Sequence, residues 1–439
     1  MVKTKVKPND VLSSLKQNML VDGFHIVLDL ERSHDCVMVD ARDGKEYIDF
    51  YAFFASLPLG FNHPGLHDAA FLEKLNMASL HKVANSDIYT TLMADFVECF
   101  GENCAHPDLP NYFFISGGSL AVENALKTAF DWKVRKNFAK GIKEERGYKV
   151  IHFKEAFHGR SGYTLSLTNT DPTKTKYFPK FDWPRVTNPK ITFPLTPDNL
   201  KKVEELEAQA IDEIMSIIRE QGDDIACLIL EPIQGEGGDN HFRGEFLRKL
   251  REITQEHDIL LVFDEVQTGV GATGKMWCFE HFGIVPDIIS FGKKLQVCGI
   301  LASDRVNEVD SVFKVSSRIN STWGANIVDM VRSQKILEII AEENLVENAA
   351  RMGDHLLKRI YEIADNAKTR ISNIRGRGLF TAFDLESPEI RNQTVSKCFD
   401  NGLAVLKSGD RSIRFRPSLN VKQEEIDKGI EILARALDV

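Results

Sequence analysis

Short apolar runs separated by more polar stretches constrain the fold of this 439-residue chain most strongly. The runs lie at 112–115, 150–153, 225–230, 259–263, 288–291 and 299–302. Between two of them, segment 197–221 is rich in Glu, Lys, Ala and Ile, with apolar residues at helical spacing. Near-continuous apolar strands that alternate with helices are typical of an α/β sheet covered on both faces. We place this sheet in a large domain at residues 66–335.

The two ends of the chain predict a second, smaller domain. Residues 37–50 have the pattern of two strands around an Asp-Gly turn, which is a hairpin signal. The C-terminal part supplies a helical stretch at 331–364, strand-like pieces at 378–385 and 413–417, and a final helix at about 422–437. We therefore expect residues 1–65 and 336–439 to combine into one small α+β domain.

The composition excludes several classes of protein. Hydrophobic residues make up 43% and charged residues 27%, which is ordinary for a folded globular chain. The formal net charge is −9 and no local run of Lys and Arg offsets it, so we expect no nucleic-acid partner. No apolar stretch approaches the roughly 18–20 residues of a membrane span. The seven cysteines form no Cys-x-x-Cys pair, which favours reduced thiols and a cytoplasmic protein. We expect no metal site.

A lysine and an aspartate at strand ends carry the strongest chemical signal. Lys293 follows the run at 288–291, and Asp264 closes the run at 259–263. A lysine inside a pocket loses its proton more readily than a solvated one, so its amine can bond to a carbonyl. A buried aspartate can hold the protonated pyridine nitrogen of pyridoxal phosphate. The pair predicts this cofactor, with Lys293 as its covalent anchor; without the lysine, Asp264 would be interpreted as a cap or turn residue.

Residues near the same strand ends predict further cofactor contacts. The Ser-Gly-Gly-Ser motif at 116–119 follows a strand and opens a helical run, so Gly118 and Ser119 can bind a phosphate at a helix N-terminus. Taken alone, the motif is better explained as a tight strand-to-helix turn. Strand alternation directs Asp264 and Val266 to one side. There Val266 can pack on the cofactor ring, and Gln267 can reach its phenolic oxygen.

Two motifs predict the substrate end of the site. In Phe-His-Gly-Arg at 157–160, Phe157 can stack on a flat ring and Arg160 can grip a carboxylate in bidentate fashion. A lone arginine is usually a solvated surface charge. The prediction that Arg160 binds substrate therefore depends on the other motifs, which indicate an amino-acid site nearby. In the segment 231–238, Glu236 lies between two glycines and can swing between positions. The alternative interpretation of this segment is a mobile surface turn.

These motifs, in this order along nearly the whole chain, resemble the class III aminotransferases of fold type I, which use pyridoxal phosphate. The resemblance also includes Gly-Phe-Asn-His-Pro at 60–64 and Arg-Gly-Arg-Gly-Leu at 375–379. It implies a large domain with a mostly parallel seven-stranded sheet covered by helices. Within the class, the phrases at 158–170, 291–299 and 320–324 are similar to those of L-lysine 6-aminotransferases.

The resemblance implies a reaction and its substrates. The terminal amino group of L-lysine passes to 2-oxoglutarate, giving glutamate and 2-aminoadipate 6-semialdehyde, which cyclises to a piperideine carboxylate, a step of lysine catabolism. The alternatives are a class III enzyme acting on ornithine, 4-aminobutyrate or a related amine, a racemase or aminomutase, and a non-catalytic binding protein. The chain departs from the class at Leu120, where glutamate is common, and at Lys294, where a small residue is usual.

Further roles follow from the resemblance alone. Thr322 of the neighbouring subunit would complete the phosphate site, which implies a homodimer with active sites at the interface. Arg160, assisted by Asn320, would hold the carboxylate distant from the reacting amine. Arg414 would take the additional carboxylate of 2-oxoglutarate. We hypothesise that Glu236 pairs with Arg414 while L-lysine is bound and moves away when 2-oxoglutarate arrives.

Overall fold

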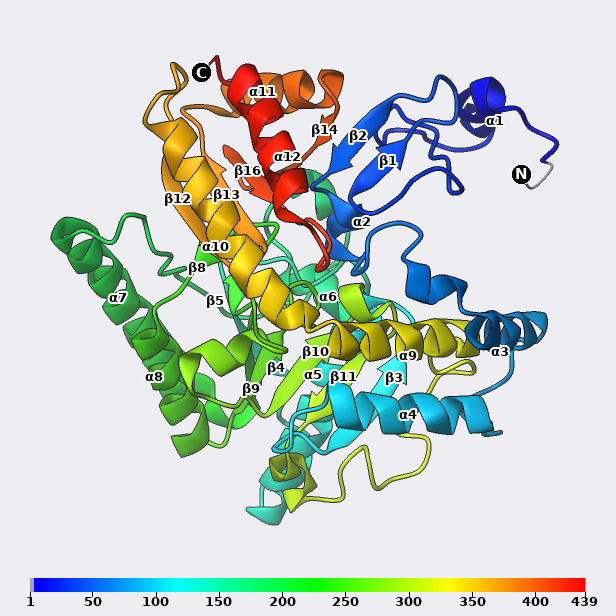
Figure 1. Cartoon of the computed structure of the whole chain (residues 1–439). Coiled ribbons are helices and arrows are strands. Elements are labelled where there is room, and N and C mark those ends of the chain that lie inside the picture. The colour runs from blue at the N-terminus through cyan, green and yellow to red at the C-terminus, as the bar shows by residue number, and fades with distance from the viewer. Residues whose placement is uncertain (1–3, 439) are drawn as a thin grey trace.

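A seven-stranded sheet forms the centre of the structure, a computed structural model that describes residues 4–438 (Figure 1). Its strands are β3 (Asn111–Ile115), β4 (Lys149–Phe153), β5 (Arg185–Val186), β6 (Ile225–Leu230), β9 (Leu260–Asp264), β10 (Ile288–Phe291) and β11 (Cys298–Ala302). They lie in the order β3-β11-β10-β9-β6-β4-β5. β11 is antiparallel to both of its neighbours, and the other pairs are parallel. The predicted mostly parallel seven-stranded sheet is confirmed.

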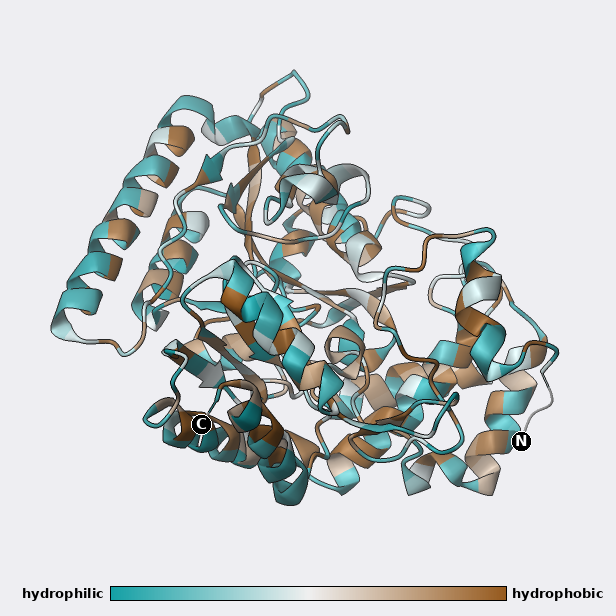
Figure 2. Cartoon of the chain, turned by 90° about the horizontal axis from the view of Figure 1, so that it is seen from above, coloured by the Kyte–Doolittle hydropathy of each residue, from teal (hydrophilic) through white to brown (hydrophobic). Residues whose placement is uncertain are grey.

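Both faces of this sheet are buried, because alternate residues of its strands pack in different hydrophobic cores. On β9, Val262 shares a cluster with residues of α5 (Gly118–Ala139). The next residue, Phe263, belongs to the larger cluster that includes residues of α8 (Gly244–Glu256). A strand with both faces buried has no polar side, which explains its continuous apolar sequence. Figure 2 shows hydrophobic residues on the central strands and hydrophilic residues on the outward faces of the peripheral helices.

Helices flank the sheet on opposite sides of the molecule. α7 (Pro197–Gln221) and α8 lie at one side, and α3 (Ala69–Leu80) and α4 (Thr91–Asn103) lie at the other (Figure 1). α3 and α4 both pack against α9 (Ile327–Glu342). α7 begins where its sequence predicts, because the Thr196 hydroxyl accepts a hydrogen bond from Asn199 N and a proline occupies the first turn.

Segments from both ends of the chain share one sheet. β1 (Val37–Val39) and β2 (Glu46–Asp49) form the predicted hairpin, and β14 (Leu403–Ala404) pairs parallel to β2. A second, antiparallel sheet has the order β12-β13-β16-β15. Its strands and the helices beside it are β12 (Ser372–Arg377), β13 (Phe380–Asp384), β15 (Leu406–Ser408), β16 (Ser412–Phe415), α10 (Leu345–Ala364), α11 (Pro388–Asp400) and α12 (Gln423–Ala436). The small α+β unit built from both termini is confirmed as part of the fold, while the bounds 1–65, 66–335 and 336–439 stay predictions.

Short elements complete the described chain. They are α1 (Val11–Lys16), α2 (Ala52–Ala55), α6 (Gly162–Leu167), the paired strands β7 (Ile233–Gln234) and β8 (Asn240–His241), and the 3-10 turns η1 (Pro8–Asp10), η2 (Pro64–His67), η3 (Pro172–Lys174), η4 (Gly222–Asp224), η5 (Cys278–Phe282), η6 (Lys293–Leu295) and η7 (Asp304–Glu308). Within residues 4–438, no helix combines the length and apolar character that a membrane crossing requires.

The structure differs from the sequence prediction at one helix. The stretch 331–364 is divided into α9 and α10, because Asn344 adopts a left-handed conformation with a φ of 54° between them. Asparagine tolerates this conformation better than most residues, so it can end one helix and begin another. The hydrophobic periodicity continues on both sides of this break and therefore does not reveal it.

Candidate active site

One cavity of about 780 Å³ lies at the C-terminal ends of the central strands and collects most of the predicted site residues. The predicted residues that line it are Gly118, Ser119, Phe157, Arg160, Glu236, Asp264, Val266, Gln267 and Lys293. Four neighbouring strands of one sheet end here, which is where open α/β sheets present their ligand sites. The cavity is also lined by residues for which the sequence predicted no role, among them Phe53, His158, Lys174 and Glu231.

Lys293 begins η6, directly after β10 and Gly292. Its backbone N–H donates to the carbonyl of Val266 across 3.2 Å, which fixes the lysine beside the end of β9. Burial and the positive charge of Arg414 lower the pKa of Lys293 to about 8, although Asp264, Glu231 and Glu236 act in the opposite direction. The unprotonated, nucleophilic amine is therefore much more abundant near neutral pH than for a solvated lysine, although the protonated form still predominates at pH 7.

Lys294 lies outside the cavity despite being adjacent in sequence. Its Nζ donates to the carbonyl of Ala55 across 3.2 Å, and the side chain is buried. Burial, together with the positive charges of Arg416 and Lys293, lowers the pKa of Lys294 to about 7. Of the two lysines, only Lys293 lines the cavity.

Asp264 ends β9 with its carboxylate held from three directions. Its oxygens lie 2.8 Å from Nδ1 of His158 and 3.1 Å from both the hydroxyl of Ser290 and the backbone nitrogen of Val266. Glu265 points to the other side of the strand, where it accepts hydrogen bonds from the backbone of η5. His158 stands in the Phe-His-Gly-Arg motif, but its contact with Asp264 joins residues 106 positions apart, which the sequence alone does not show.

The N-terminus of α5 faces the cavity, and glycines at 117 and 118 leave its backbone uncovered by side chains. Gly117 has a φ of 106°, a conformation that favours glycine, and Gly118 begins the helix. A Cβ on Gly118 would lie 2.8 Å from Val266 Cγ1, so only glycine allows this approach. The Ser119 hydroxyl bonds to those of Ser161 and Thr164 at 2.5 and 2.7 Å. Free backbone N–H groups and hydroxyls gathered at a helix N-terminus suit a phosphate.

Glu236 lies between two cations. One carboxylate oxygen accepts a hydrogen bond from Arg414 Nη2 at 2.6 Å, and the other accepts one from Lys174 Nζ at 2.5 Å. Arg414 comes from β16 in the small sheet and is almost fully buried. The structure therefore contains the Glu236–Arg414 contact on which the charge-masking hypothesis depends. Gln267 accepts weaker bonds from Arg414 and Arg416.

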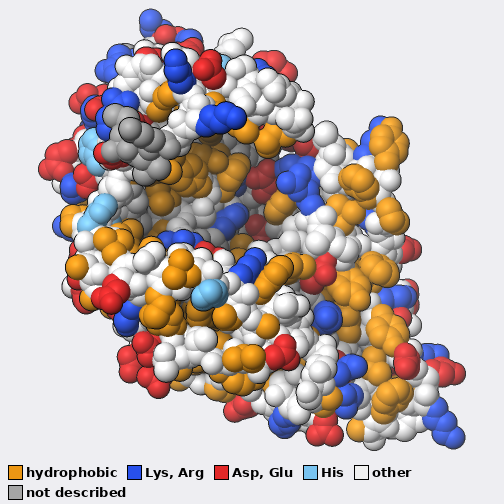
Figure 3. All heavy atoms as spheres, turned by 90° about the vertical axis from the view of Figure 1, so that its right-hand side faces the viewer, with side chains coloured by type: hydrophobic (Ala, Val, Ile, Leu, Met, Phe, Trp, Pro, Cys, Tyr) orange, Lys and Arg blue, Asp and Glu red, His pale blue; other side chains and the backbone are white. Residues whose placement is uncertain are grey.

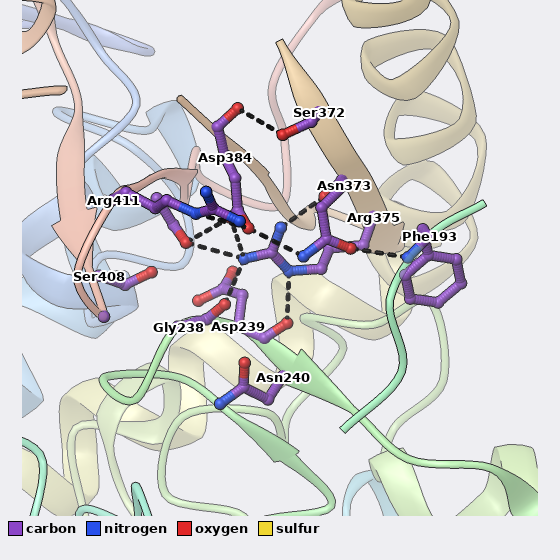
Figure 4. Close-up of polar contacts among 12 residues, drawn as sticks. Phe193, Gly238, Asp239, Asn240, Ser372, Asn373, Arg375, Asp384, Ser408 and Arg411 are labelled. Carbon is purple, nitrogen blue, oxygen red and sulfur yellow. Dashed lines mark hydrogen bonds and ion pairs between the residues drawn. The ribbon is translucent and has the colours of Figure 1, made fainter. Parts of the chain in front are cut away.

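The backbone around Glu236 is buried and clamped, so the mobile surface turn is ruled out. β7 and β8 pair on either side of the loop, and Gly409 N donates to the carbonyl of Glu236. Figure 4 shows Arg375 of β12 reaching the carbonyls of Gly238 and Asp239, while its guanidinium lies 2.9 Å from Asp384. Because this backbone is fixed, any change in the partners of Glu236 requires a rotation of its side chain.

Three predicted residues do not line the cavity of their own chain: Arg414, which contacts it through Glu236, and Asn320 and Thr322. Asn320 and Thr322 are both exposed. The Asn320 side chain accepts a hydrogen bond from Ser321 N, and the carbonyl of Thr322 accepts one from Ser86. A single chain therefore does not bring either residue to Lys293.

The fold and the site define an aminotransferase: the chain belongs to the class-III aminotransferase family, whose model it matches over residues 19–437. It is 48% identical to the L-lysine-epsilon aminotransferase of Mycobacterium tuberculosis (strain ATCC 25618 / H37Rv) over 434 residues, 98% of this chain and 96% of the relative. The corresponding protein of Streptomyces clavuligerus is 43% identical over 431 residues, 98% and 94% of the two chains. A solved structure of lysine aminotransferase from M. tuberculosis in the internal aldimine form matches with a TM-score of 0.96, 48% identity and 99% coverage of both chains. The predicted family and fold are confirmed.

Proposed function

We propose that the protein is a pyridoxal-phosphate-dependent L-lysine 6-aminotransferase, which transfers the terminal amino group of L-lysine to 2-oxoglutarate. The observation that carries the proposal is one cavity lined by Lys293, Asp264, the N-terminus of α5 and Glu236, with the buried Arg414 bonded to Glu236. The similarity to L-lysine-epsilon aminotransferases over nearly the full length supports the choice of substrate. The products are glutamate and 2-aminoadipate 6-semialdehyde, which cyclises.

The residues around Lys293 fit pyridoxal phosphate. Gly118 and Ser119 would hold its phosphate at the start of α5, and Asp264 would hold the proton of its ring nitrogen. Phe157 and Val266 would flank the ring. Gln267 would reach its phenolic oxygen. When bound, the cofactor supplies the aldehyde that receives the amino group and a ring that withdraws electrons.

Lys293 has two tasks in this proposal. Its Nζ anchors the cofactor between turnovers, and once released it moves a proton to and from the reacting carbon as general base and acid. The low pKa of Lys293, about 8, suits both tasks because the unprotonated amine is accessible near neutral pH. His158 and Ser290 contact the Asp264 carboxylate and orient it.

The other end of the cavity would distinguish the two substrates by charge. Arg160 would hold the carboxylate of L-lysine that lies far from the reacting amine. Glu236 would mask Arg414 during this half of the reaction and release it for the additional carboxylate of 2-oxoglutarate. The paired geometry at 2.6 Å supports this role.

We propose a homodimer, because Thr322 and Asn320 reach an active site only if a second copy supplies them. Hydrophobic side chains are exposed on α3 and the segment after it, including Leu80 and Tyr89, which are 68% and 74% exposed. This segment adjoins the Thr322 loop through the hydrogen bond from Asn85 to the carbonyl of Trp323. Figure 3 shows hydrophobic side chains spread over the face on this side of the molecule, around a hollow that contains basic residues. A cytoplasmic location remains a prediction.

Product identification tests the proposed activity. The purified enzyme with pyridoxal phosphate and 2-oxoglutarate is given L-lysine, ornithine or 4-aminobutyrate, and the aldehyde product and glutamate are measured together. We expect L-lysine to give the highest kcat/KM, with one glutamate formed for each aldehyde. A higher kcat/KM for another amine would assign a different class III activity, and turnover without 2-oxoglutarate would indicate a racemase or aminomutase.

A further inference from the structure

Lys174 is a cavity residue with no part in the function proposed so far. It ends η3, a turn that Pro172 opens and that the Asp171 side chain caps by accepting a hydrogen bond from Thr173 N. Its side chain lines the cavity beside Phe157, with Nζ 5.4 Å from the centre of the phenylalanine ring. The short capped turn therefore delivers one cation to the substrate end of the cavity.

Lys174 and Arg414 hold different oxygens of the same carboxylate. The Glu236 oxygens lie 2.5 Å from Lys174 and 2.6 Å from Arg414. Burial alone would raise the pKa of the Glu236 carboxyl, but the charge of Arg414 and the hydrogen bond from Lys174 outweigh it, so the pKa lies below its usual value. Glu236 is therefore an anion shared between a nearly inaccessible arginine and a partly exposed lysine.

The two substrates of the proposed function make opposite demands on this arrangement. L-lysine brings no second carboxylate, so Arg414 needs Glu236 as its partner. 2-Oxoglutarate brings one, so Glu236 must leave Arg414 to the substrate. A carboxylate displaced without any cation would remain beside the incoming anion, and like charges at close range in a partly buried site repel strongly.

We propose that Lys174 is the alternative partner of Glu236, which retains the Glu236 carboxylate while Arg414 binds a dicarboxylate. This inference rests on the proposed function. Lys174 thereby acts as a positioning residue: it lowers the free energy needed to separate Glu236 from Arg414, without itself bonding to the substrate. Because the loop backbone is clamped by Arg375 and Gly409, the exchange would take place by rotation of the Glu236 side chain.

A double-mutant cycle on the holoenzyme tests this role through binding rather than turnover. The dissociation constant of glutarate, an unreactive dicarboxylate, is measured by calorimetry for the wild type, Lys174→Met, Glu236→Gln and the double variant. We expect Lys174→Met to weaken glutarate binding about tenfold, because Glu236 then has Arg414 as its one partner. In the Glu236→Gln background the same substitution should change binding by less than about threefold, since only screened, longer-range attraction remains.

Two other outcomes would overturn the proposal. A tenfold loss in both backgrounds would mean that Lys174 bonds to the dicarboxylate itself, and no loss in either would mean that it is irrelevant to binding. Lys174→Arg should restore wild-type affinity. Lys180→Met is the matched control: it removes a nearby exposed lysine that bonds to the carbonyls of Thr175 and Phe178 outside the cavity, and it should leave glutarate binding unchanged.

The half-reactions separate a failure of this inference from a failure of the proposed function. In single turnovers, Lys174→Met should slow the reaction with 2-oxoglutarate about tenfold and leave the reaction with L-lysine within about threefold of wild type. If the wild-type holoenzyme does not react with L-lysine, the proposed function fails. If the wild type reacts but the variant is slowed equally in both halves, Lys174 has no selective role.

Discussion

The two ends of the cavity are built from different kinds of structure. The end around Lys293 is formed by residues that directly follow strands of one sheet: Gly118 after β3, Asp264 at the end of β9 and Lys293 after β10. The other end is assembled from a clamped loop, a 3-10 turn and the small sheet, which supply Glu236, Lys174 and Arg414. The first end depends on strand register and the second on ion pairs between distant parts of the chain.

For the proposed function, this difference would explain how one cavity can serve two substrates of different charge. Strand register and buried hydrogen bonds hold Asp264 in one geometry, which chemistry on a single cofactor requires. The proposed exchange of ion pairs at Glu236 would need only a rotation of its side chain, because the two pairs involve different carboxylate oxygens. In the proposed function, the fixed end would perform the same proton transfers in both half-reactions, while the exchangeable end would adapt to the substrate.

The largest effect should come from breaking the fixed end at Lys293. Lys293→Ala removes the amine that anchors the cofactor and moves the proton, so we expect turnover to fall by at least about a thousandfold. The visible absorbance of the covalent cofactor–lysine link should disappear as well. Lys294→Met is the matched control and should keep that absorbance. An unchanged spectrum in Lys293→Ala would move the anchor to another lysine.

A smaller and selective effect should come from the exchangeable end. Glu236→Ala leaves Arg414 unmasked when L-lysine occupies the cavity, so we expect the lysine half-reaction to slow about 10- to 100-fold. The 2-oxoglutarate half-reaction should change much less, because it needs Arg414 free. Single-turnover measurements with each substrate compare the two. Equal losses in both halves would reject the exchange of partners by Glu236.

The sequence predicted the fixed end better than the exchangeable end, for a physical reason. Buried parallel strands must be continuously apolar, so β6 and β9 were visible as runs, and residues at their ends could be placed together. β5 was not visible because it has only two residues, Arg185 and Val186, at the edge of the sheet. The break between α9 and α10 depends on the conformation of one asparagine, which periodicity does not report.

Contacts between distant segments account for what was missed in the site. Lys174 lies in a short polar stretch with no motif of its own, and it gains importance only because the fold brings it to Glu236, 62 positions away. Arg414 was placed only through the resemblance to a family, since its own strand gives no sign of the loop that it contacts. Thr322 remains outside the cavity of its own chain, so its role depends on an assembly that a single chain does not contain.

Lys294 connects the fixed end to the wall of the cavity. Its Nζ bonds to the carbonyl of Ala55, the last residue of α2, in which Phe53 and Phe54 have φ values of 51° and 60°. This left-handed conformation is unfavourable for residues other than glycine. Both phenylalanines line the cavity. A buried lysine, whose surroundings lower its pKa to about 7, thus supports a strained segment that shapes the site.

The smallest expected effect is on the pH dependence of stability. The pKa of Lys294 is about 7 in the folded protein, against 10.5 for a solvated lysine, so between these values the unfolded chain binds a proton that the folded chain does not. This group therefore makes stability rise with pH, by up to about 1.4 kcal/mol per pH unit. Lys294→Met should flatten that rise, measured as the thermal midpoint of the holoenzyme from pH 7 to 10, whereas Lys180→Met should not. Parallel curves for the wild type and Lys294→Met would show that Lys294 is charged in the folded protein and that the wall at Ala55 is held by an ammonium group.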